Sequence, residues 1–158
     1  MRGEVHSINV SDGGVPKSMV ESANITKSGV QGDFNRVRSG RGGSADRAVC
    51  IFSLELIQLL KHEGHPIEIG STGENLTIRG VEWESLSEGM RLEIGDVVLE
   101  LSEPCAPCSK IGGSFIGREF DRVNHDKEYG WSRWLARVLR EGEVTVGDSV
   151  NIVITPDR

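Results

Sequence analysis

Two cysteines at a C-x-x-C spacing, Cys105 and Cys108, are the residues of this chain best suited to chemistry. They lie in the segment PCAPCSK, residues 104–110, directly after a strongly apolar stretch that is predicted to be a strand. A thiolate is both a nucleophile and a soft metal ligand, and a nearby cation such as Lys110 favours the thiolate form. Because the two prolines of the segment cannot continue a central strand, we expect both sulfurs to lie on a turn.

Residue chemistry leaves several interpretations of this pair open: a redox dithiol, half of a zinc site, one working thiolate beside a spectator, or two inert cysteines. A structural zinc site needs about four ligands, usually from two such pairs. Neither Cys50 nor the four scattered histidines supplies a second pair, so no zinc is expected. A thioredoxin-like dithiol should begin a helix, and residues 109–113 are not predicted to be helical. One working thiolate is therefore favoured, and Cys50, in the apolar run 48–52, is predicted to be a buried core residue.

A basic, glycine-rich loop is the second candidate for function. Residues 29–48 are rich in glycine and serine, and they contain Arg36, Arg38, Arg41 and Arg47. Glycines let backbone N–H groups turn toward a ligand, and the planar guanidinium fork matches phosphate oxygens. The loop therefore predicts a small phosphorylated ligand, with Lys17 as a further contact, although a solvated flexible loop explains the composition equally well.

A shaped polar loop precedes a predicted strand at residues 70–78. Glycines bound the loop at Gly70 and Gly73, and the acid–amide pair Glu74 and Asn75 comes immediately before the apolar residues. This pattern is typical of an ordinary turn, and it is also compatible with polar side chains that point into a site.

Composition and charge narrow the functional class. The chain has 158 residues, a net charge of −6 and 37% hydrophobic residues. These values predict one domain, residues 1–158, with an ordinary core, and they argue against general binding to nucleic acid or to anionic membranes. No run approaches the roughly 20 apolar residues of a membrane helix, and the N-terminus lacks the apolar region of a signal peptide. Three cysteines, an odd number, are simplest to explain in a reducing cytoplasm.

The apolar periodicity predicts a β-rich chain with two helices. Strands are expected at residues 5–10 and 48–52, and a helix is expected from the N-cap Ser53 through Lys61. Apolar residues at helical spacing predict a second helix over residues 131–139. Glycine-centred reversals predict one hairpin at residues 92–101 and another at 144–154. A hairpin that recurs after a helix favours an antiparallel barrel or sandwich.

In their order along the chain, these segments resemble the MOSC domain, the molybdenum cofactor sulfurase C-terminal family. The matching segments are residues 13–17, 32–33, 41–43, 46–49, 73–77, 89, 94–96, 99–100 and 107–108. Each segment is weak by itself, whereas the ordered set is specific. The resemblance implies a mainly β fold with a few helices, a MOSC-type barrel similar to the pyruvate-kinase β-barrel, in a small stand-alone protein of bacterial type.

The resemblance also implies that one cysteine is the key residue, and the matching position is Cys108. Cys105 falls where relatives often carry an arginine, and Arg41 falls where many carry a histidine. A second thiol three residues from Cys108 could resolve a persulfide or form a reversible disulfide, which the commoner pattern does not allow.

Two kinds of chemistry follow from the resemblance, and the chain is expected to be either sulfurtransferase-like or a molybdenum-dependent oxidoreductase. In the favoured one, Cys108 takes sulfane sulfur from a pyridoxal-phosphate-dependent cysteine desulfurase, holds it as a persulfide beside Lys110, and delivers it to a metal–sulfur acceptor or to molybdenum cofactor. In the other, the chain is a molybdenum-cofactor-dependent reductase of N-hydroxylated compounds with Cys108 as the molybdenum ligand, and a flavin or iron–sulfur protein supplies electrons.

The residues expected around the cofactor are common to both kinds of chemistry. Lys17, Arg41 and Arg47 would contact the pterin phosphate, and Glu74 with Asn75 would shape the pocket. A third interpretation, a non-catalytic carrier of molybdopterin, needs the basic loop and not the thiol.

Overall fold

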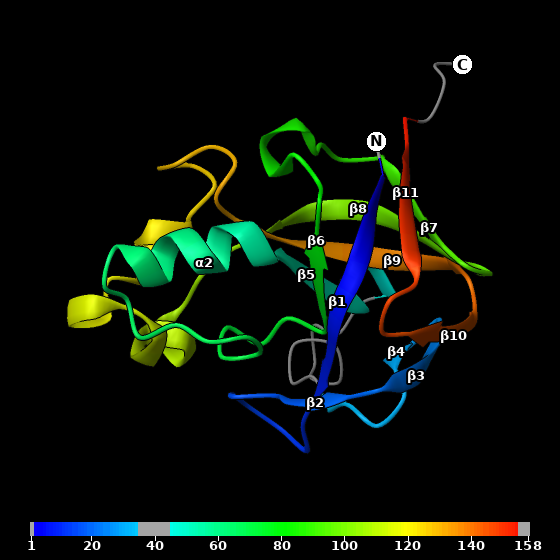
Figure 1. Ribbon diagram of the computed structural model, residues 1–158, viewed down its shortest axis with the longest axis horizontal. Coiled ribbons are helices and arrows are strands. Elements are labelled where there is room, and N and C mark those ends of the chain that lie inside the picture. Colours follow the sequence, from blue (N-terminus) through cyan, green and yellow to red (C-terminus); the bar gives the residue numbers. More distant parts are fainter. Residues whose placement is uncertain (1, 35–44, 155–158) are drawn as a thin grey trace.

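The computed structural model describes residues 2–34 and 45–154, and seven of the described strands close a barrel (Figure 1). Around the barrel the strands run β1 (Arg2–Val10), β11 (Ser149–Val153), β7 (Arg91–Ile94), β8 (Val97–Cys105), β9 (Arg133–Arg140), β5 (Val49–Ser53) and β6 (Leu76–Arg79). The ring closes because β1 pairs with β6 on one side and with β11 on the other. The mainly β barrel expected from the sequence is thus confirmed.

All neighbours in the ring are antiparallel except β5 and β6, which are parallel. A parallel pair needs a crossover, and helix α2 (Leu54–His62) begins it. The predicted N-cap is confirmed, since the Ser53 hydroxyl accepts a hydrogen bond from the backbone N–H of Leu56. Leu54, Ile57 and Leu60 form the buried face of the helix.

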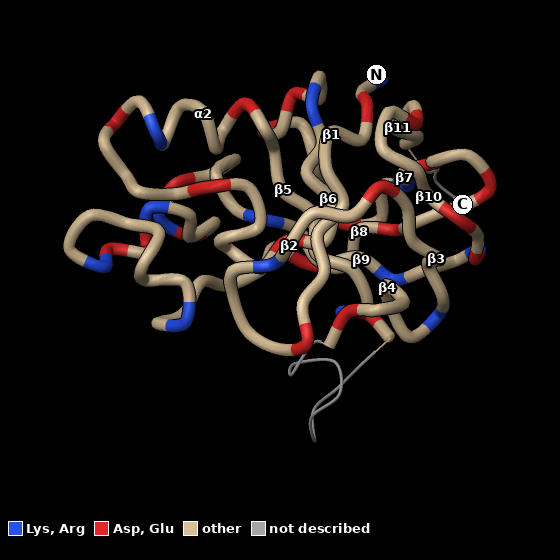
Figure 2. The backbone as a smooth tube through the Cα atoms, turned by 60° about the horizontal axis from the view of Figure 1, so that its bottom comes forward, with Lys and Arg blue, Asp and Glu red and all other residues tan. Residues whose placement is uncertain are grey.

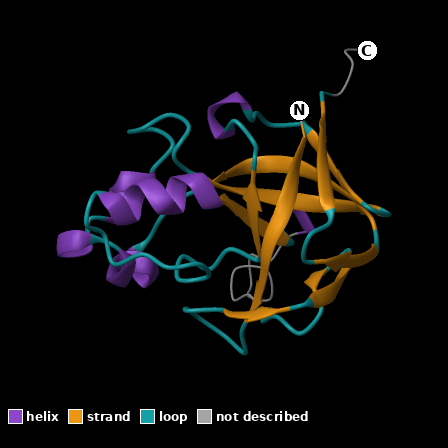
Figure 3. Ribbon diagram, viewed as in Figure 1, coloured by secondary structure: helices purple, strands orange, loops and turns teal. Residues whose placement is uncertain are grey.

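Smaller elements complete the fold (Figure 3). Strand β2 (Ser18–Val20) pairs with the end of β1, and β10 (Gly142–Thr145), β3 (Ser22–Thr26) and β4 (Gly29–Val30) form a separate small sheet. The 3-10 helices are η1 (Ala45–Arg47), η2 (Trp83–Ser85), η3 (Ser109–Ser114), η4 (Ile116–Arg118) and η5 (Phe120–Val123). Helix α2 and η3–η5 gather beyond one end of the barrel, where Arg122 forms an ion pair with Glu63 at 2.7 Å.

The barrel interior forms the main hydrophobic core. Fully buried side chains from different strands meet there, including Val5, Ile8, Ile51, Leu76 and Leu99. Closed barrels of this size are filled by the inward-facing side chains of each strand. The packed interior leaves the ends of the barrel as the places where side chains can surround a cavity.

The predicted helix over residues 131–139 is wrong, because this segment is strand β9. Its backbone hydrogen-bonds to β5 on one side and β8 on the other. Five of its eight residues are buried, so apolar side chains occur without strict alternation, and their spacing imitates a helix.

The first predicted hairpin is confirmed as β7 and β8, whereas the second is not a hairpin. Strand β10 pairs with β3 in the small sheet, and β11 enters the barrel between β1 and β7. The turn between them is held by other strands, since the N–H of Gly147 donates to the carbonyl of Val5. Tertiary contacts here separate two strands that the local sequence would pair.

Charged residues of both signs are mixed along the chain in the view of Figure 2. Among the described residues, no helix is long and apolar enough to cross a membrane.

Candidate functional site

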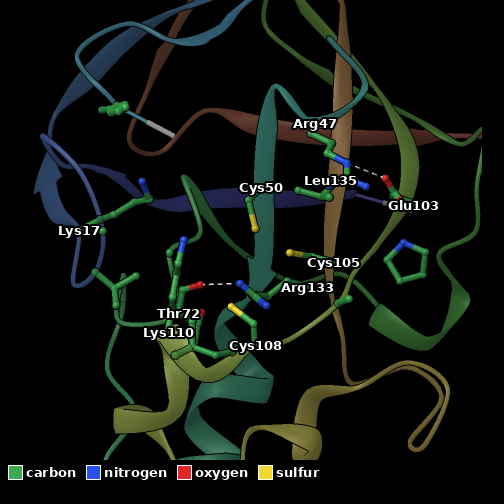
Figure 4. Close-up of a pocket in the computed structure, with 17 residues that line it drawn as sticks. Lys17, Arg47, Cys50, Thr72, Glu103, Cys105, Cys108, Lys110, Arg133 and Leu135 are labelled. Atoms are coloured by element: carbon green, nitrogen blue, oxygen red, sulfur yellow. Dashed lines mark hydrogen bonds and ion pairs between the residues drawn. The ribbon is translucent and has the colours of Figure 1, made fainter. Parts of the chain in front are cut away.

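A cavity of about 410 Å³ opens at the barrel end where β8 finishes and η3 begins (Figure 4). Its walls come from the turn at residues 14–17, the loop at 72–73, strands β5 and β9, and the segment 103–111. Segments far apart in the sequence therefore converge on the C-x-x-C region.

The two cysteines of this region lie in different surroundings. Pro104 and Cys105 are the last residues of β8, so the expectation that both sulfurs lie on a turn is wrong for Cys105. Pairing with β7 ends at Glu100, and Pro104 is tolerated because β9 is the only described strand that pairs with β8 there. Cys108 follows in a short irregular segment and is exposed.

Residues 109–113, which were not predicted to be helical, form most of the 3-10 helix η3 (Ser109–Ser114). The backbone N–H of Ile111 donates to the carbonyl of Cys108 at 3.1 Å, which anchors the thiol-bearing residue to the start of η3. A short 3-10 helix of six residues needs no apolar periodicity, so the sequence pattern did not reveal it.

Cys50 is buried as predicted, and it also lines the cavity, a role that the sequence did not suggest. Cys50 lies opposite Leu135, and Cys105 lies opposite Arg133, on the two flanks of β9. Residues two apart on a strand share a face, so these four side chains all point into the cavity. Figure 4 shows the sulfurs of all three free cysteines around it.

A hydrogen-bond contribution from the neighbouring Cys50 thiol is the main cause that lowers the pKa of Cys105 to about 6. The charges of Arg133 and Arg47 act in the same direction, against the opposing effect of burial. The same hydrogen-bond contribution and burial raise the pKa of Cys50 well above its ordinary value. The directions of the two shifts favour the thiolate form at Cys105 and the thiol form at Cys50.

Arg133 is the functional candidate that the sequence missed most clearly. Its side chain is only 5% exposed, and its Nη1 donates to the carbonyl of Thr72 at 2.6 Å. Its Nε is buried without a hydrogen-bond partner among the described residues. Burial lowers the pKa of Arg133, but the charge of the Cys105 thiolate raises it, and the net shift is upward. A buried guanidinium with an unused donor beside a cavity can bind an anionic ligand.

The lysines and arginines predicted to contact a ligand differ in burial and in their ion-pair partners. Lys17 lines the cavity, but its Nζ forms a buried ion pair with Asp33 at 2.6 Å. Arg47 lines the cavity too, and its Nε lies 3.1 Å from Glu103 in a half-exposed pair. Lys110 is exposed at the cavity wall. Arg41, together with Arg36 and Arg38, lies outside the described residues.

Glu74 and Asn75 lie behind the cavity wall. The Glu74 carboxylate accepts hydrogen bonds from the N–H of Gly70 and the hydroxyls of Thr72 and Thr77, at 2.7–3.1 Å. The Asn75 amide accepts from the N–H of Cys50 at 3.0 Å. The expected pair thus shapes the site indirectly, by holding the 70–74 loop and the cysteine of β5.

Asn75 also connects Cys50 with the ion pair of Lys17 and Asp33. Its Nδ2 donates to the Asp33 carboxylate at 3.0 Å, and that carboxylate holds Lys17. A continuous set of buried polar contacts therefore runs from Cys50 through Asn75 to Lys17, and such networks rigidify a site when their members are satisfied.

The arrangement favours ligand binding by anion recognition and thiol chemistry over a metal site made by protein alone. Within the described ranges, no group of three or more His, Cys, Asp or Glu side chains could hold a metal ion. The thiols do supply soft donors, and Arg133 supplies a buried cation.

Comparisons with known proteins agree with this architecture. A sequence model of the MOSC domain matches residues 38–151. The chain is similar to the uncharacterized protein YflK of Bacillus subtilis, with 29% identity over 112 residues, and to a protein named reductase from Gibberella moniliformis, with 32% identity over 134 residues. These matches cover 70% and 81% of this chain, and the chain spans only 50% and 23% of those relatives.

Solved structures share the whole fold. YuaD of Bacillus subtilis superposes with a TM-score of 0.76 at 20% identity, covering 99% of this chain and 98% of its own. YiiM of Geobacillus stearothermophilus superposes with a TM-score of 0.73 at 24% identity, covering 96% of this chain and 75% of its own. The sequence match over most of the chain and the shared barrel lead to one conclusion: this chain belongs to the MOSC domain family.

Proposed function

We propose that the chain binds molybdenum cofactor in this cavity and carries sulfane sulfur on Cys108, as a persulfide, to a molybdenum-cofactor or metal–sulfur acceptor. The observation that carries the proposal is an exposed thiol at a cavity that also holds a buried, incompletely bonded guanidinium. The MOSC family is associated with molybdenum cofactor, and the chain belongs to that family.

The residues of the cavity fit such a ligand. A volume of about 410 Å³ lies within the usual range of small-molecule sites. The Nε of Arg133, which has no partner among the described residues, and the exposed ammonium of Lys110 offer donors to a pterin phosphate. Lys17 and Arg47 would add cationic contacts if a ligand competes with Asp33 and Glu103.

The sulfur-carrier reaction uses Cys108 as the nucleophile. Its thiolate attacks the outer sulfur of a persulfide on a partner desulfurase, forming a new S–S bond while the donor cysteine leaves as a thiolate. No net oxidation occurs, and the proton on the outer sulfur moves with it. Exposure of Cys108 allows a protein donor to reach it. Lys110, two residues on and also exposed, favours the anionic persulfide.

A second candidate function is reduction, and the similarity to a protein named reductase favours it. Molybdenum cofactor would then supply two-electron redox chemistry, with Cys108 as a soft thiolate ligand of the metal. Arg133 and Lys110 would hold the phosphate as above, and a flavin or iron–sulfur partner would deliver electrons.

Composition of the purified protein separates these functions. Protein from a host that makes molybdenum cofactor is assayed for molybdenum and pterin, and apoprotein is incubated with a cysteine desulfurase and cysteine. The carrier proposal expects one added sulfur, lost in Cys108→Ala and kept in the exposed control variant Ser109→Ala. Stoichiometric molybdenum with no added sulfur would overturn it in favour of reduction. Cofactor retention with unchanged pathway activity in Cys108→Ser would point to a non-catalytic carrier.

A further inference from the structure

Cys105 lies inside the cavity, in surroundings quite unlike those of Cys108. It is held in strand β8, half-buried, and Cys50 of β5 lines the same cavity on the other flank of β9. Cys108 is exposed and lies outside any strand. Both line the same cavity, so the site presents one thiol to solvent and another to its interior.

Charged and titratable groups face Cys105 from each element packed around it. Arg133 of β9 lies opposite it in the strand register, and Arg47 approaches from η1. Glu103 of β8 opposes them, although its carboxylate is paired with Arg47 at 3.1 Å. Cys50 contributes a thiol proton and no charge. The net surroundings favour an anionic sulfur at Cys105.

We propose that Cys105 is a second working thiol, which takes the sulfane sulfur from Cys108 and holds it in the cavity, with Cys50 and Arg133 as its positioning residues. This inference rests on the sulfur-carrier function proposed above. It assigns an order to the two cysteines: Cys108 meets the protein donor, and Cys105 presents the sulfur to the bound acceptor.

The transfer is balanced without a further reactant. The Cys105 thiolate attacks the outer sulfur of the Cys108 persulfide, so that a bond forms between the Cys105 Sγ and that sulfur. The bond from the outer sulfur to the Cys108 Sγ breaks, and Cys108 leaves as a thiolate. The proton on the outer sulfur then passes to the Cys108 thiolate, so that the products are a persulfide anion on Cys105 and a neutral thiol at Cys108, and no oxidant or reductant is needed.

The surroundings also favour the product over the starting persulfide. A persulfide anion at Cys105 would carry its charge into the cavity beside the guanidinium of Arg133, whose Nε has no partner among the described residues. Charge-assisted hydrogen bonds are stronger than neutral ones. The charge of Cys108 also interacts with Arg133, but Cys108 is exposed, so solvent screens that attraction more than it does at Cys105.

A time course of sulfur loading tests the order. The protein is mixed with a cysteine desulfurase and cysteine, quenched with an alkylating agent, and digested with trypsin, which places both cysteines in peptide 92–110 and Cys50 in peptide 48–61. Fragment ions on either side of Ala106 and Pro107 locate the extra sulfur. We expect it first on Cys108 and then on Cys105, and we expect it to stay on Cys108 in Cys105→Ser.

The outcomes separate this inference from the proposed function. Failure of Cys108 to load overturns the carrier function. Loading of Cys108 without later appearance at Cys105 overturns only the relay, as does a Cys105–Cys108 disulfide with release of hydrosulfide. Direct loading of Cys105 in Cys108→Ala overturns the order.

Conservative variants test the role of Cys50. In Cys50→Ala the loading of Cys108 should be unchanged, while transfer to Cys105 slows at least tenfold. Cys50→Ser, whose hydroxyl can donate in place of the thiol, should recover most of the rate. Equal transfer rates in the wild type and both variants would overturn the positioning role, and the wild-type time course decides the relay even if Cys50→Ala folds poorly.

Discussion

Cys105 and Arg133 lie directly opposite each other where β8 pairs with β9, at the end of the ladder that opens into the cavity. Opposed residues of antiparallel strands project to the same face, with Cβ atoms about 5 Å apart. The MOSC resemblance implies that relatives often carry an arginine at the position of Cys105. In this chain a thiol occupies that position, and a guanidinium enters the cavity from the register partner.

Loss of the guanidinium should make the Cys105 thiol less acidic. In Arg133→Met the pKa of Cys105 should rise from about 6, because a cation that stabilises the thiolate is gone. Alkylation of Cys105 at pH 7 in a Cys108→Ser background should slow by roughly threefold to tenfold. Arg133→Lys should lie in between, and Arg79→Met, which removes an exposed arginine paired with Glu4, should have no effect. If the pH profile of Cys105 alkylation is unchanged in Arg133→Met, Arg133 does not stabilise the Cys105 thiolate electrostatically.

Stability should rise with pH between about 6 and 9 because of Cys105. The pKa of this thiol is lowered to about 6 in the folded protein, so over this window the unfolded chain binds a proton that the folded protein has released. The contribution is complete above the ordinary thiol pKa and is lost as the pH falls through 6. Its slope is at most about 1.4 kcal/mol per pH unit.

Urea unfolding of the wild type and Cys105→Ser across this range reports the effect, because titrating groups that do not interact with Cys105 cancel in the difference. The two curves should converge near pH 6 and separate as the pH rises. Parallel curves would show that Cys105 titrates normally. Above pH 9 the raised pKa of Cys50 works in the opposite direction.

Removal of one partner of the buried ion pair between Lys17 and Asp33 should strongly destabilise the fold. Lys17→Met leaves a carboxylate buried without its cation and should cost about 3 kcal/mol, less than the extreme because backbone and amide donors also bind it. Lys17→Met with Asp33→Asn should recover part of this loss. The matched control, Lys61→Met, removes an exposed partner of Glu68 and should cost about 0–1 kcal/mol. If urea unfolding gives equal losses of unfolding free energy for Lys17→Met and Lys61→Met, the buried pair has no special stabilising role.

Glu74→Gln should weaken both the fold and ligand binding. The carboxylate accepts three hydrogen bonds. In the variant, the amide nitrogen that replaces one carboxylate oxygen can no longer accept a hydrogen bond from the group that it faces. The expected loss is about 1–3 kcal/mol. Thr72, whose carbonyl holds Arg133, belongs to the same loop, so binding of molybdopterin should fall as well. Glu68→Gln, on the exposed side of the loop, serves as the control for thermal unfolding and binding.

Several features of the fold could be predicted because they depend on short stretches of chain. The Ser53 cap, the α2 helix and the β7–β8 hairpin follow from capping, periodicity and turn chemistry within a dozen residues. Strand β9 and the separation of β10 from β11 could not be predicted in this way. Their conformation depends on partners far along the chain, which override the local pattern.

The sequence by itself determined the family, the β-rich class and the thiols on which chemistry should depend, because ordered motifs and residue types are local properties. Only the tertiary structure decided how those thiols differ. Closure of the barrel brings Cys50 of β5 and Arg133 of β9 to the end of β8, where they surround Cys105, and it leaves Cys108 exposed. Burial, hydrogen bonding and the approach of a charge arise from strand register, and spacing along the chain does not contain them.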